Sequence, residues 1–581
     1  MSGVLSRLAG RLRTGDLVTG ISRLLALACL VGLVGMLPWL SGKDPALTIL
    51  RATSSDREPT PEILNSIRKS IGIDGGPLHV IGHWLAGVAR GDLGRSWVSG
   101  ADVGPDAVDA FGVSLSLMAA ALGVGVIVAA ALVLPALRDG LRGRPRPRGG
   151  AASAVLISLP EYLLAPILML VLAVYLRILP PFGWGSPEKV IMPALSLGLP
   201  TGGYLGGLVS DAVTATFSER WVATWSTAGI RGWPLAGAVL RRALAPLTGQ
   251  VALIVVALTG GAVAVEKIFA IPGLGRELLD AASAQDVPAL QAQILLLLAL
   301  ALTTGVIAGA VRRLLMGRAA GVGGLTAPPP VEHPGRAARV IAVSGAALLA
   351  LMVAVGIRRD PYAVVADKLT QPSAALPLGA DSLGRDVLAR VAHGAVSTVS
   401  GAVIVTVVCF VIAMLVGLAP RAATGFIEVA NAAPPILAGL IVAGVSGPSA
   451  TGAAVAVAGV GWAPLASHAA GLVAENRQRP DVLLAPVLGE GRVRITLTRV
   501  LPAVVGPLAR HAALRLPGKA LALAALGFLG LGAQSPAPDW GLVLSDALPY
   551  IERAPWAVAT PAAALVILSI TSVAASRSMR R

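Results

Sequence analysis

Long apolar runs alternate with polar segments along almost the whole chain. In the first part of the sequence the runs lie at about residues 24–40, 113–137, 152–176, 194–216, 247–269 and 291–311. In the second part they lie at about residues 340–355, 399–418, 427–445, 453–473, 501–526 and 557–575. Each run comes close to the roughly 20 residues that a helix needs to cross a bilayer. The pattern predicts an all-α polytopic membrane protein with about 12 transmembrane helices.

The two sets of six runs share one layout. Each set has one run, a long polar segment, three runs, a glycine-containing basic loop and two final runs, with a short polar segment between those two. A Gly/Pro-rich polar stretch separates the sets and reads as a linker. We therefore predict a first domain at 1–315 with an extracytoplasmic segment at 43–111, a cytosolic linker at 316–338 and a second domain at 339–581. Parallel repeats of this kind are typical of transporters.

Composition and charge support this interpretation. The chain has 581 residues, of which 55% are hydrophobic and 13% charged, about half the charged share of a soluble protein. The net charge of +16 could indicate binding to nucleic acid, but the arginines lie in short blocks beside the apolar runs. Basic residues collect in this way in cytosolic loops, so we predict a lipid bilayer as the partner and no nucleic acid. The six histidines show no clustered spacing, so no metal site is predicted.

The stretch 477–502, RQRPDVLLAPVLGEGRVRITLTRVLP, is too charged to lie in hydrocarbon. Pro480 is expected to start a short helix, and Gly489 to end it after about two and a half turns. A second amphipathic stretch then leads to Leu501 and Pro502, where we expect the chain to re-enter the membrane. This predicts a cytosolic loop of two helices joined by a glycine turn.

Five further stretches carry distinctive motifs. They are GDLGRS at 91–96, GAVAVEKIFAIPGLG at 261–275, QDVP at 285–288, PSAALPLGADSLGRDVLAR at 372–390 and GFLGLGAQSPAPDWG at 527–541. Together with the basic loop, they resemble the two permease types of the dipeptide/oligopeptide/nickel ABC importers, in the order usual for that family. The resemblance covers nearly the whole chain and implies two type I ABC-importer-like six-helix permease halves fused in one chain.

The resemblance assigns motif or gating positions in five segments. They are Gly91, Asp92, Gly94, Glu266, Phe269, Pro272, Gly273, Gly275, Asp286, Gly379, Asp381, Gly384, Arg385, Asp386, Phe528, Gly530, Gly532, Asp539, Trp540 and Gly541. It also assigns two loops that dock on ATPases, with positions Trp221, Ala228, Gly229, Arg241, Arg242, Ala485, Gly489, Leu501 and Pro502. Pro486, inside the first helix of the second loop, departs from the family pattern.

The resemblance further implies partners and a location. The chain is expected to work with two ABC ATPase subunits, or one fused ATPase chain, and with an extracytoplasmic substrate-binding protein. It is expected in the bacterial cytoplasmic membrane, crossing it many times, with both termini in the cytosol. No catalytic residue and no cofactor are predicted for this chain, because ATP and Mg would be used by the partner ATPases. Short peptides are the implied substrate, with nickel or metal chelates as alternatives.

The chemistry of some motif residues can be anticipated. Asp381, Arg385 and Asp386 can form charge-assisted hydrogen bonds that fasten a segment as a structural clasp. Trp540 and Trp184 are expected at the membrane interface. Glu266 lies near the end of an apolar run, where it is either a functional carboxylate or the partner of a neighbouring cation.

Two other classes of protein compete with the importer. The sequence holds no GxxxxGK[ST], so the chain is not expected to bind ATP phosphates itself. A proton- or ion-coupled secondary transporter with 12 helices should place acids or histidines well inside several spans. Only Glu161, Asp211 and Glu266 are candidates, and we expect all three near span ends. A membrane-bound enzyme would need paired carboxylates or metal ligands within spans, and none stands out.

Overall fold

A computed structural model describes residues 2–40, 46–47, 49–50, 58–71, 76–145, 150–316 and 336–578. The described residues are almost entirely helical, and only isolated β-bridges occur among them. Most of the predicted linker, residues 317–335, lies outside the described residues. The prediction of an all-α polytopic protein is confirmed.

The helices before residue 317 are α1 (Ser2–Gly35), α2 (Leu37–Leu40), α4 (Pro61–Ile71), α5 (Pro77–Ala89), α6 (Val103–Leu141), α7 (Gly150–Ile157), α8 (Glu161–Leu168), the π-helix η2 (Met169–Tyr175), α9 (Pro187–Phe217), α10 (Arg220–Thr227), α11 (Trp233–Leu244), the 3₁₀-helix η3 (Ala245–Leu247), α12 (Thr248–Phe269), α13 (Leu274–Ala284) and α14 (Val287–Met316). After residue 335 come α15 (Arg336–Gly356), α16 (Val387–Gly417), α17 (Pro420–Ala432), α18 (Pro435–Ser446), α19 (Ala450–Gly461), α20 (Ala463–Asn476), α21 (Pro480–Leu484), α22 (Arg492–Ile495), the π-helix η5 (Thr496–Val500), α23 (Leu501–Leu529), α24 (Trp540–Ala547), the 3₁₀-helix η6 (Leu548–Tyr550) and α25 (Pro555–Ser578).

Nine helical stretches of the described chain are long and apolar enough to cross a membrane, and each coincides with a predicted apolar run. A tenth is α17 with α18, a pair bent by 88° where Pro434 interrupts the helix. The two other predicted runs correspond to α9 and to the interrupted series α7, α8 and η2. In that series, the break falls at Ser158–Pro160, inside the predicted run 152–176.

The described chain forms two compact units. Unit 1 comprises Met1–Gly104, Ala281–Ala292 and Gly394–Leu542, and unit 2 comprises Pro105–Asp280, Gln293–His393 and Val543–Arg581. Each unit takes helices from both sides of the 316–338 linker, so the units differ from the two predicted domains. The domain boundaries themselves stay a prediction.

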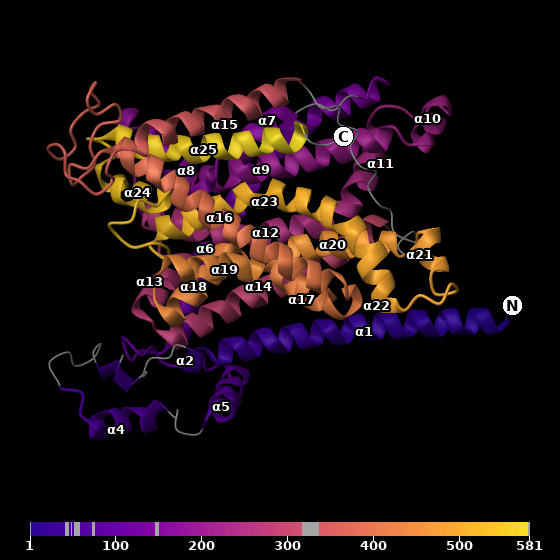
Figure 1. The fold of residues 1–581 in the computed structure, drawn as a ribbon, viewed down its shortest axis with the longest axis horizontal. Helices are drawn as coiled ribbons and strands as arrows, with labels where there is room; N and C mark the ends of the chain where they lie inside the picture. The colour runs from indigo at the N-terminus through magenta and orange to yellow at the C-terminus, as the bar shows by residue number, and fades with distance from the viewer. Residues whose placement is uncertain are drawn as a thin grey trace. The chain divides into compact units, whose positions relative to one another are not determined.

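In unit 1, α1 packs along α17 (Figure 1). The Ser22 hydroxyl donates to the carbonyl of Ala422 (2.6 Å) and accepts from the N–H of Gly425 (3.0 Å). A Cβ at Gly425 would lie 2.3 Å from the Ser22 carbonyl oxygen, so the two backbones approach as closely as glycine permits. Arg23 and Glu428 form a two-point ion pair at 2.7 Å beside this contact.

In unit 2, α15 packs along α25, and α9 contacts α7, α8, α11 and α12 (Figure 1). Gly198, Gly202 and Gly206 of α9 recur every four residues and therefore share one face. A Cβ at each would lie within 2.7 Å of a side chain of α6. Small residues thus allow close helix packing, as is typical of membrane bundles.

Candidate functional site

The acid of the 261–275 motif caps a helix. Glu266 is completely buried at the end of α12, and its carboxylate accepts hydrogen bonds from the Ser114 hydroxyl (2.6 Å) and the Arg276 N–H (3.0 Å). Ser114, on α6, also accepts from the N–H of Leu274 (2.9 Å). Leu274 and Arg276 belong to the first turn of α13, whose N–H groups lack helical partners and favour negative charge.

The glycines of the same motif make room for this carboxylate. A Cβ at Gly273 would lie 2.3 Å from Cδ of Glu266, and one at Gly275 would lie 2.9 Å from its Oε2. Phe269 is buried, whereas Pro272 is exposed. Glu266, which we predicted to be either functional or paired with a neighbour, therefore has a definite set of partners: a serine and the start of α13.

The acid of the 527–541 motif caps another helix. Asp539 immediately precedes α24 and accepts from the N–H groups of Gly541 (2.9 Å) and Leu542 (3.3 Å). The hydroxyl of Thr398, on α16, donates to its other oxygen at 3.1 Å. A Cβ at Gly527 would lie 2.4 Å from Oδ1 of Asp539. Burial raises the pKa of Asp539, and its hydrogen bonds oppose that rise.

The remaining glycines of this motif shape the turn before Asp539. Gly530 ends α23 in the left-handed region, with φ 83°, which a side chain would disfavour. A Cβ at Gly532 would lie 3.0 Å from Cα of Gly527, and one at Gly541 would lie 1.8 Å from the Ala524 carbonyl oxygen. Phe528 is buried in this packing.

One aromatic prediction is wrong. Trp540 was expected at the membrane interface, but it is fully buried. Its indole lies against Gly394 of α16, where a Cβ would come within 2.8 Å of the ring. The absence of a side chain at Gly394 therefore leaves room for the ring. Trp184 is half-buried.

Two motifs that are far apart in sequence meet in unit 1. Asp286 precedes α14, and its carboxylate accepts from the Ser96 hydroxyl and from the N–H of Trp97 (3.1 Å). The turn that presents Ser96 uses Gly91 and Gly94, which have φ of 84° and 94°. Asp92 fastens it by accepting from the N–H of Gly94 at 2.9 Å. The GDLGRS and QDVP motifs thus form one joint.

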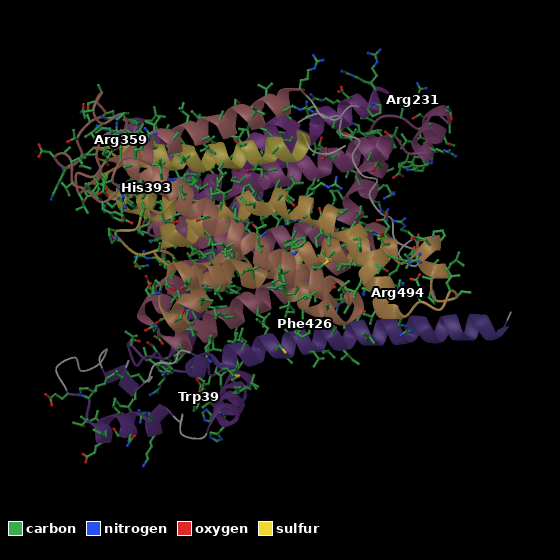
Figure 2. All side chains as sticks on the ribbon, in the orientation of Figure 1. Trp39, Arg231, Arg359, His393, Phe426 and Arg494 are labelled. Carbon is green, nitrogen blue, oxygen red and sulfur yellow. The ribbon has the colours of Figure 1, made fainter. Side chains whose placement is uncertain are left out.

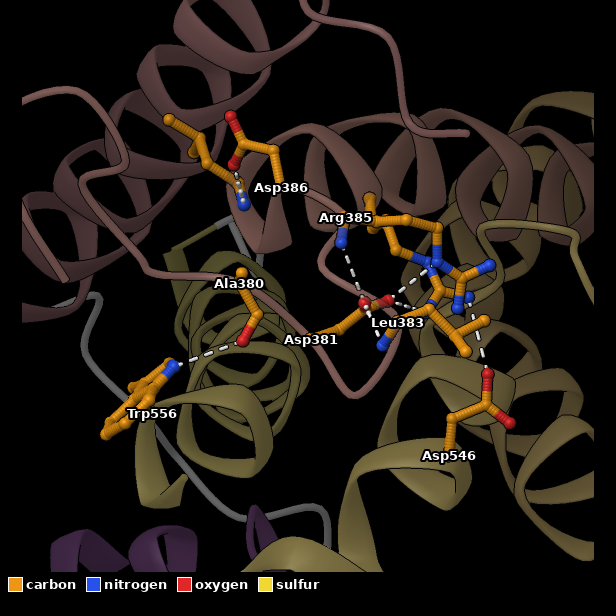
Figure 3. A network of polar contacts seen from close by, with 9 residues as sticks. Ala380, Asp381, Leu383, Arg385, Asp386, Asp546 and Trp556 are labelled. Atoms are coloured by element: carbon orange, nitrogen blue, oxygen red, sulfur yellow. Dashed lines mark hydrogen bonds and ion pairs between the residues drawn. The ribbon is translucent and has the colours of Figure 1, made fainter. Parts of the chain in front are cut away.

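The 372–390 motif forms a clasp in unit 2 (Figure 3). Asp381 accepts from the N–H groups of Leu383 and Arg385 (both 2.9 Å), from Nε of Arg385 (2.8 Å) and from Arg390 (2.7 Å). Burial alone would raise the pKa of Asp381, but these hydrogen bonds and the two arginine charges outweigh it and lower the pKa. Arg390, almost fully buried, also reaches Asp546 at 3.4 Å.

Asp386, in the same clasp, caps α16. It accepts from the N–H of Leu388 (2.8 Å) and forms an ion pair with Arg359 (2.7 Å). Gly379 and Gly384, with φ of 69° and 82°, allow the turn, and a Cβ at Gly384 would lie 2.1 Å from the Ala366 carbonyl oxygen. The structure therefore places Asp381, Arg385 and Asp386 in one network that fastens the segment before α16.

The first basic loop joins α9 to α11 in unit 2. The short helix α10 ends at Thr227, Ala228 is exposed, and Gly229 takes the left-handed conformation with φ 85°. The Trp221 indole and Arg242 both bind Glu219, at 2.6 and 3.0 Å. Arg241 donates to the last carbonyls of α14, those of Leu314 and Leu315. The short helices α10 and α11 are thereby tied to each other and to the end of α14.

The second basic loop joins α20 to α23 in unit 1. Helix α21 begins at Pro480 as predicted, but it ends at Leu484, so the expected two and a half turns are wrong. Pro486 has no N–H to continue the helical ladder. Ala485 is buried, and Gly489, with φ 82°, makes the predicted turn.

The return from this loop is helical. The expected second stretch is α22 and η5, which continue into α23 without interruption; re-entry into the membrane at Leu501 and Pro502 stays a prediction. Arg499 binds Glu490 through two bonds and donates to the Asp481 carbonyl at 3.1 Å. The pKa of Glu490 is lowered by its hydrogen bond from Arg499. These contacts fold the loop back on the start of the long helix.

In each unit the basic loop lies far from the motif segments. Within unit 2, Arg231 of the first loop stands at the end opposite Arg359 and His393 (Figure 2). Within unit 1, the 29 residues of α23 separate the second loop, before Leu501, from the 527–541 motif at the other end of that helix, and Arg494 and Trp39 also stand far apart (Figure 2). Each unit therefore has a loop end and a motif end.

Comparison with known proteins identifies the family. The model of one protein family, the binding-protein-dependent transport system inner membrane component, matches this sequence twice, at residues 150–320 and 406–580. The chain belongs to this permease family. The double match agrees with the resemblance to two fused permeases, and the apolar helices make this permease a multi-pass inner-membrane protein.

Several curated permeases are similar to parts of this chain. The peptide transport system permease protein SapC of Escherichia coli O6:H1 is 35% identical over 202 residues, which cover 33% of this chain and 67% of SapC. The di/tripeptide transport system permease protein DppC of Pseudomonas aeruginosa is 33% identical over 34% of this chain and 67% of DppC. The glutathione transport system permease protein GsiC of Salmonella choleraesuis is 32% identical over 303 residues, 50% of this chain and 90% of GsiC.

The permease also holds ionisable side chains that the sequence interpretation placed wrongly or missed. Glu161 was expected near a span end, but it starts α8 at the break inside the run 152–176, with its carboxylate against Gly261. His468, His511, Arg515 and Lys519 lie within α20 and α23, and none was recognised. The available signal was the spacing of four between the last three, which puts them on one helix face.

Proposed function

We propose that this permease forms the membrane path of an ATP-driven importer and couples to separate ATPase subunits through its two basic loops. The loop-end surface carries the proposal. In the second loop Leu483, Leu484, Val487 and Leu488 are between 59% and 82% exposed. An apolar cluster of this kind beside arginines is typical of a protein-docking site.

The first loop, at the loop end of unit 2, exposes aromatic side chains and one isoleucine. Trp225, Ile230 and Trp233 are exposed, and the Trp233 side chain is 82% accessible. Arg241 of the first loop hydrogen-bonds to the end of α14, and Glu490 of the second loop pairs with Arg499. A force on either loop would therefore move long helices. In the proposed cycle, ATP closes the two ATPases, draws the loops together and rocks the helices, and hydrolysis resets them.

The proposal fixes a topology and partners. The loop end and both termini lie in the cytosol, and the motif end faces a substrate-binding protein outside. The ATPases use ATP and Mg, whereas this chain has no catalytic role. The relatives named for peptide, di/tripeptide and glutathione transport support short peptides as the substrate.

Affinity purification of the tagged full chain from its native membrane, followed by mass spectrometry, tests the coupling. We expect one or two ABC ATPases to co-purify. Gly489→Val is expected to lose them, because valine disfavours φ 82°. Gly491→Val is the matched control, since Gly491 has φ −70° and open space around it.

A second pair of variants tests the first loop. Gly229→Val is expected to weaken ATPase recovery, and Gly237→Ala, in the following helix with nothing within 4 Å, is expected to retain it. Recovery of the permease without any ATPase, while it still transports peptide, contradicts the proposal.

A further inference from the structure

Helix α23 carries a stripe of basic side chains in the middle of an apolar span. His511, Arg515 and Lys519 are spaced by four residues and therefore lie along one face of the helix. Arg515 stands at the midpoint of α23 (Leu501–Leu529). We call these three residues, with His468 of α20, the basic stripe.

The members of the basic stripe are held by contacts within unit 1. Nε of Arg515 donates to Nε2 of His511 at 3.1 Å. The His511 ring stacks on the His468 ring, with centroids 4.3 Å apart and an angle of 28° between the planes. The stripe is therefore a connected arrangement across two packed helices.

Lys519 is the most deeply placed member. It is 5% exposed and lies beside the thiol of Cys409. A Cβ at Gly461 would lie 3.4 Å from Cε of Lys519, so the glycine leaves space for this side chain. Among the ion pairs of the described residues, none joins Lys519 to a carboxylate. The Lys519 side chain is therefore buried without a carboxylate partner among the described residues.

The depth of the stripe argues against lipid headgroups as its anionic partner. Arg515 lies about 20 Å along α23 from either end, farther than half of a hydrocarbon core about 30 Å thick. Arg515 is nevertheless exposed. A charged side chain at this depth is costly against hydrocarbon, and such side chains typically face the bundle interior or a water-filled cavity.

We propose that the basic stripe binds carboxylates of the transported substrate, so that the permease favours peptides with acidic side chains. This inference rests on the proposed transport of peptides. The Arg515 guanidinium offers planar donors that match a carboxylate, and Lys519 adds a second positive charge one turn further along the helix.

The test is direct binding of two isosteric dipeptides, Ala-Glu and Ala-Gln, to the purified full chain in nanodiscs. Both have the same termini and almost the same shape, and they differ by one charge. We expect Ala-Glu to bind about tenfold more tightly than Ala-Gln, the effect of one additional charge-assisted bond. Arg515→Gln should abolish most of this preference, and Arg515→Lys should keep part of it.

Two further variants complete the design. Lys519→Gln removes another charge of the stripe and should also reduce the preference, whereas Arg510→Gln removes an exposed charge from the same helix off the stripe and should leave it. Equal binding of both dipeptides to the unaltered chain, or equal weakening of both by Arg515→Gln, overturns the proposal. The assay needs no ATPase, so failure of ATP-driven transport would leave a measured preference standing and can be distinguished from failure of this inference.

Discussion

The two short helices α13 and α24 are both capped by a buried carboxylate that lies against a glycine, but the carboxylate and the glycine come from opposite segments in the two cases. Each follows a long apolar helix, and a buried carboxylate satisfies the first N–H groups of each. At α13 the carboxylate comes from the long helix and the glycines from the turn, as Glu266 and Gly273 show. At α24 the carboxylate comes from the turn and the glycine from the long helix, as Asp539 and Gly527 show.

This exchange explains why the two motifs look unlike each other in sequence. In one motif the glutamate precedes PGLG, and in the other the aspartate follows FLGLG. In both, the carboxylate caps a helix and accepts a hydrogen bond from a hydroxyl group of α6 or α16. Asp286 and Asp386 similarly precede α14 and α16 and cap them. Glu266, Asp539, Asp286 and Asp386 therefore all act on helix ends.

The largest effect is expected from filling the space beside the carboxylates. Gly273→Ala and Gly527→Ala would put a methyl group 2.3 Å from Cδ of Glu266 and 2.4 Å from Oδ1 of Asp539. Each should lower the free energy of unfolding by about 3 kcal/mol, the upper range for overpacking. The measurement is thermal unfolding of the purified chain in detergent, followed by tryptophan fluorescence.

Gly249→Ala and Gly518→Ala are the controls for these two variants. They lie in α12 and α23, and nothing stands within 4 Å of the added atom. Their effect should stay below about 1 kcal/mol and be stabilising, since alanine favours helix. If Gly527→Ala behaves like Gly518→Ala, the carboxylate of Asp539 does not occupy the described position.

Replacing each capping carboxylate by its amide is expected to destabilise the two caps to different extents. Glu266→Gln should cost about 2 kcal/mol, because an amide N–H directed at Ser114 leaves the Ser114 hydroxyl proton, which now binds Glu266, without its acceptor. Asp539→Asn should cost less than about 1 kcal/mol, because asparagine is as good a cap as aspartate and the Thr398 hydroxyl can accept from its amide. Equal losses in thermal unfolding would show that the two caps do not differ in this way.

The two hydroxyls sharpen the comparison further. Ser114 makes two hydrogen bonds, to Glu266 and from Leu274, whereas Thr398 donates one to Asp539. Ser114→Ala should therefore cost about 1.5 kcal/mol and Thr398→Ala about 1 kcal/mol, measured by the same unfolding assay. A larger loss for Thr398→Ala would contradict the assigned bonds.

The smallest expected effect is a pH dependence of the stability, and it involves α13 but not α24. Burial, together with the charges of Asp106, Asp280 and Asp109, raises the pKa of Glu277 to about 7. The folded state thus favours the protonated carboxyl, and stability falls as pH rises from the ordinary carboxyl range through about 7. Glu277→Gln removes this fall, so it should raise the midpoint of thermal unfolding at about pH 8 and leave it unchanged near pH 4.

Glu188→Gln, which removes an exposed acid from the same unit, is the control for the pH measurement. An equal rise of the midpoint at both pH values for Glu277→Gln would show that its carboxyl does not titrate in this range.

The sequence predicted the helical class and the position of the apolar helices because hydrophobic run length depends only on local composition. It predicted the start of α21 from Pro480 and the turn from Gly489, which are local effects as well. It missed the length of α21, where Pro486 removes a donor.

What sequence could not predict depends on contacts between distant segments. The burial of Trp540 needs Gly394, and the joint of Asp286 needs Ser96, which is far away in the chain. The pairing of His468 with His511 depends on the packing of α20 against α23. The spacing of His511, Arg515 and Lys519 was visible in the sequence, but it was read as part of an apolar run.

The most direct test of the account is uptake of a labelled dipeptide in cells whose partner ATPases carry substitutions that abolish ATP hydrolysis. The account predicts that uptake through this permease is lost although the chain is made and reaches the membrane. Uptake that persists in these cells and follows an ion gradient would contradict it and would establish a secondary transporter.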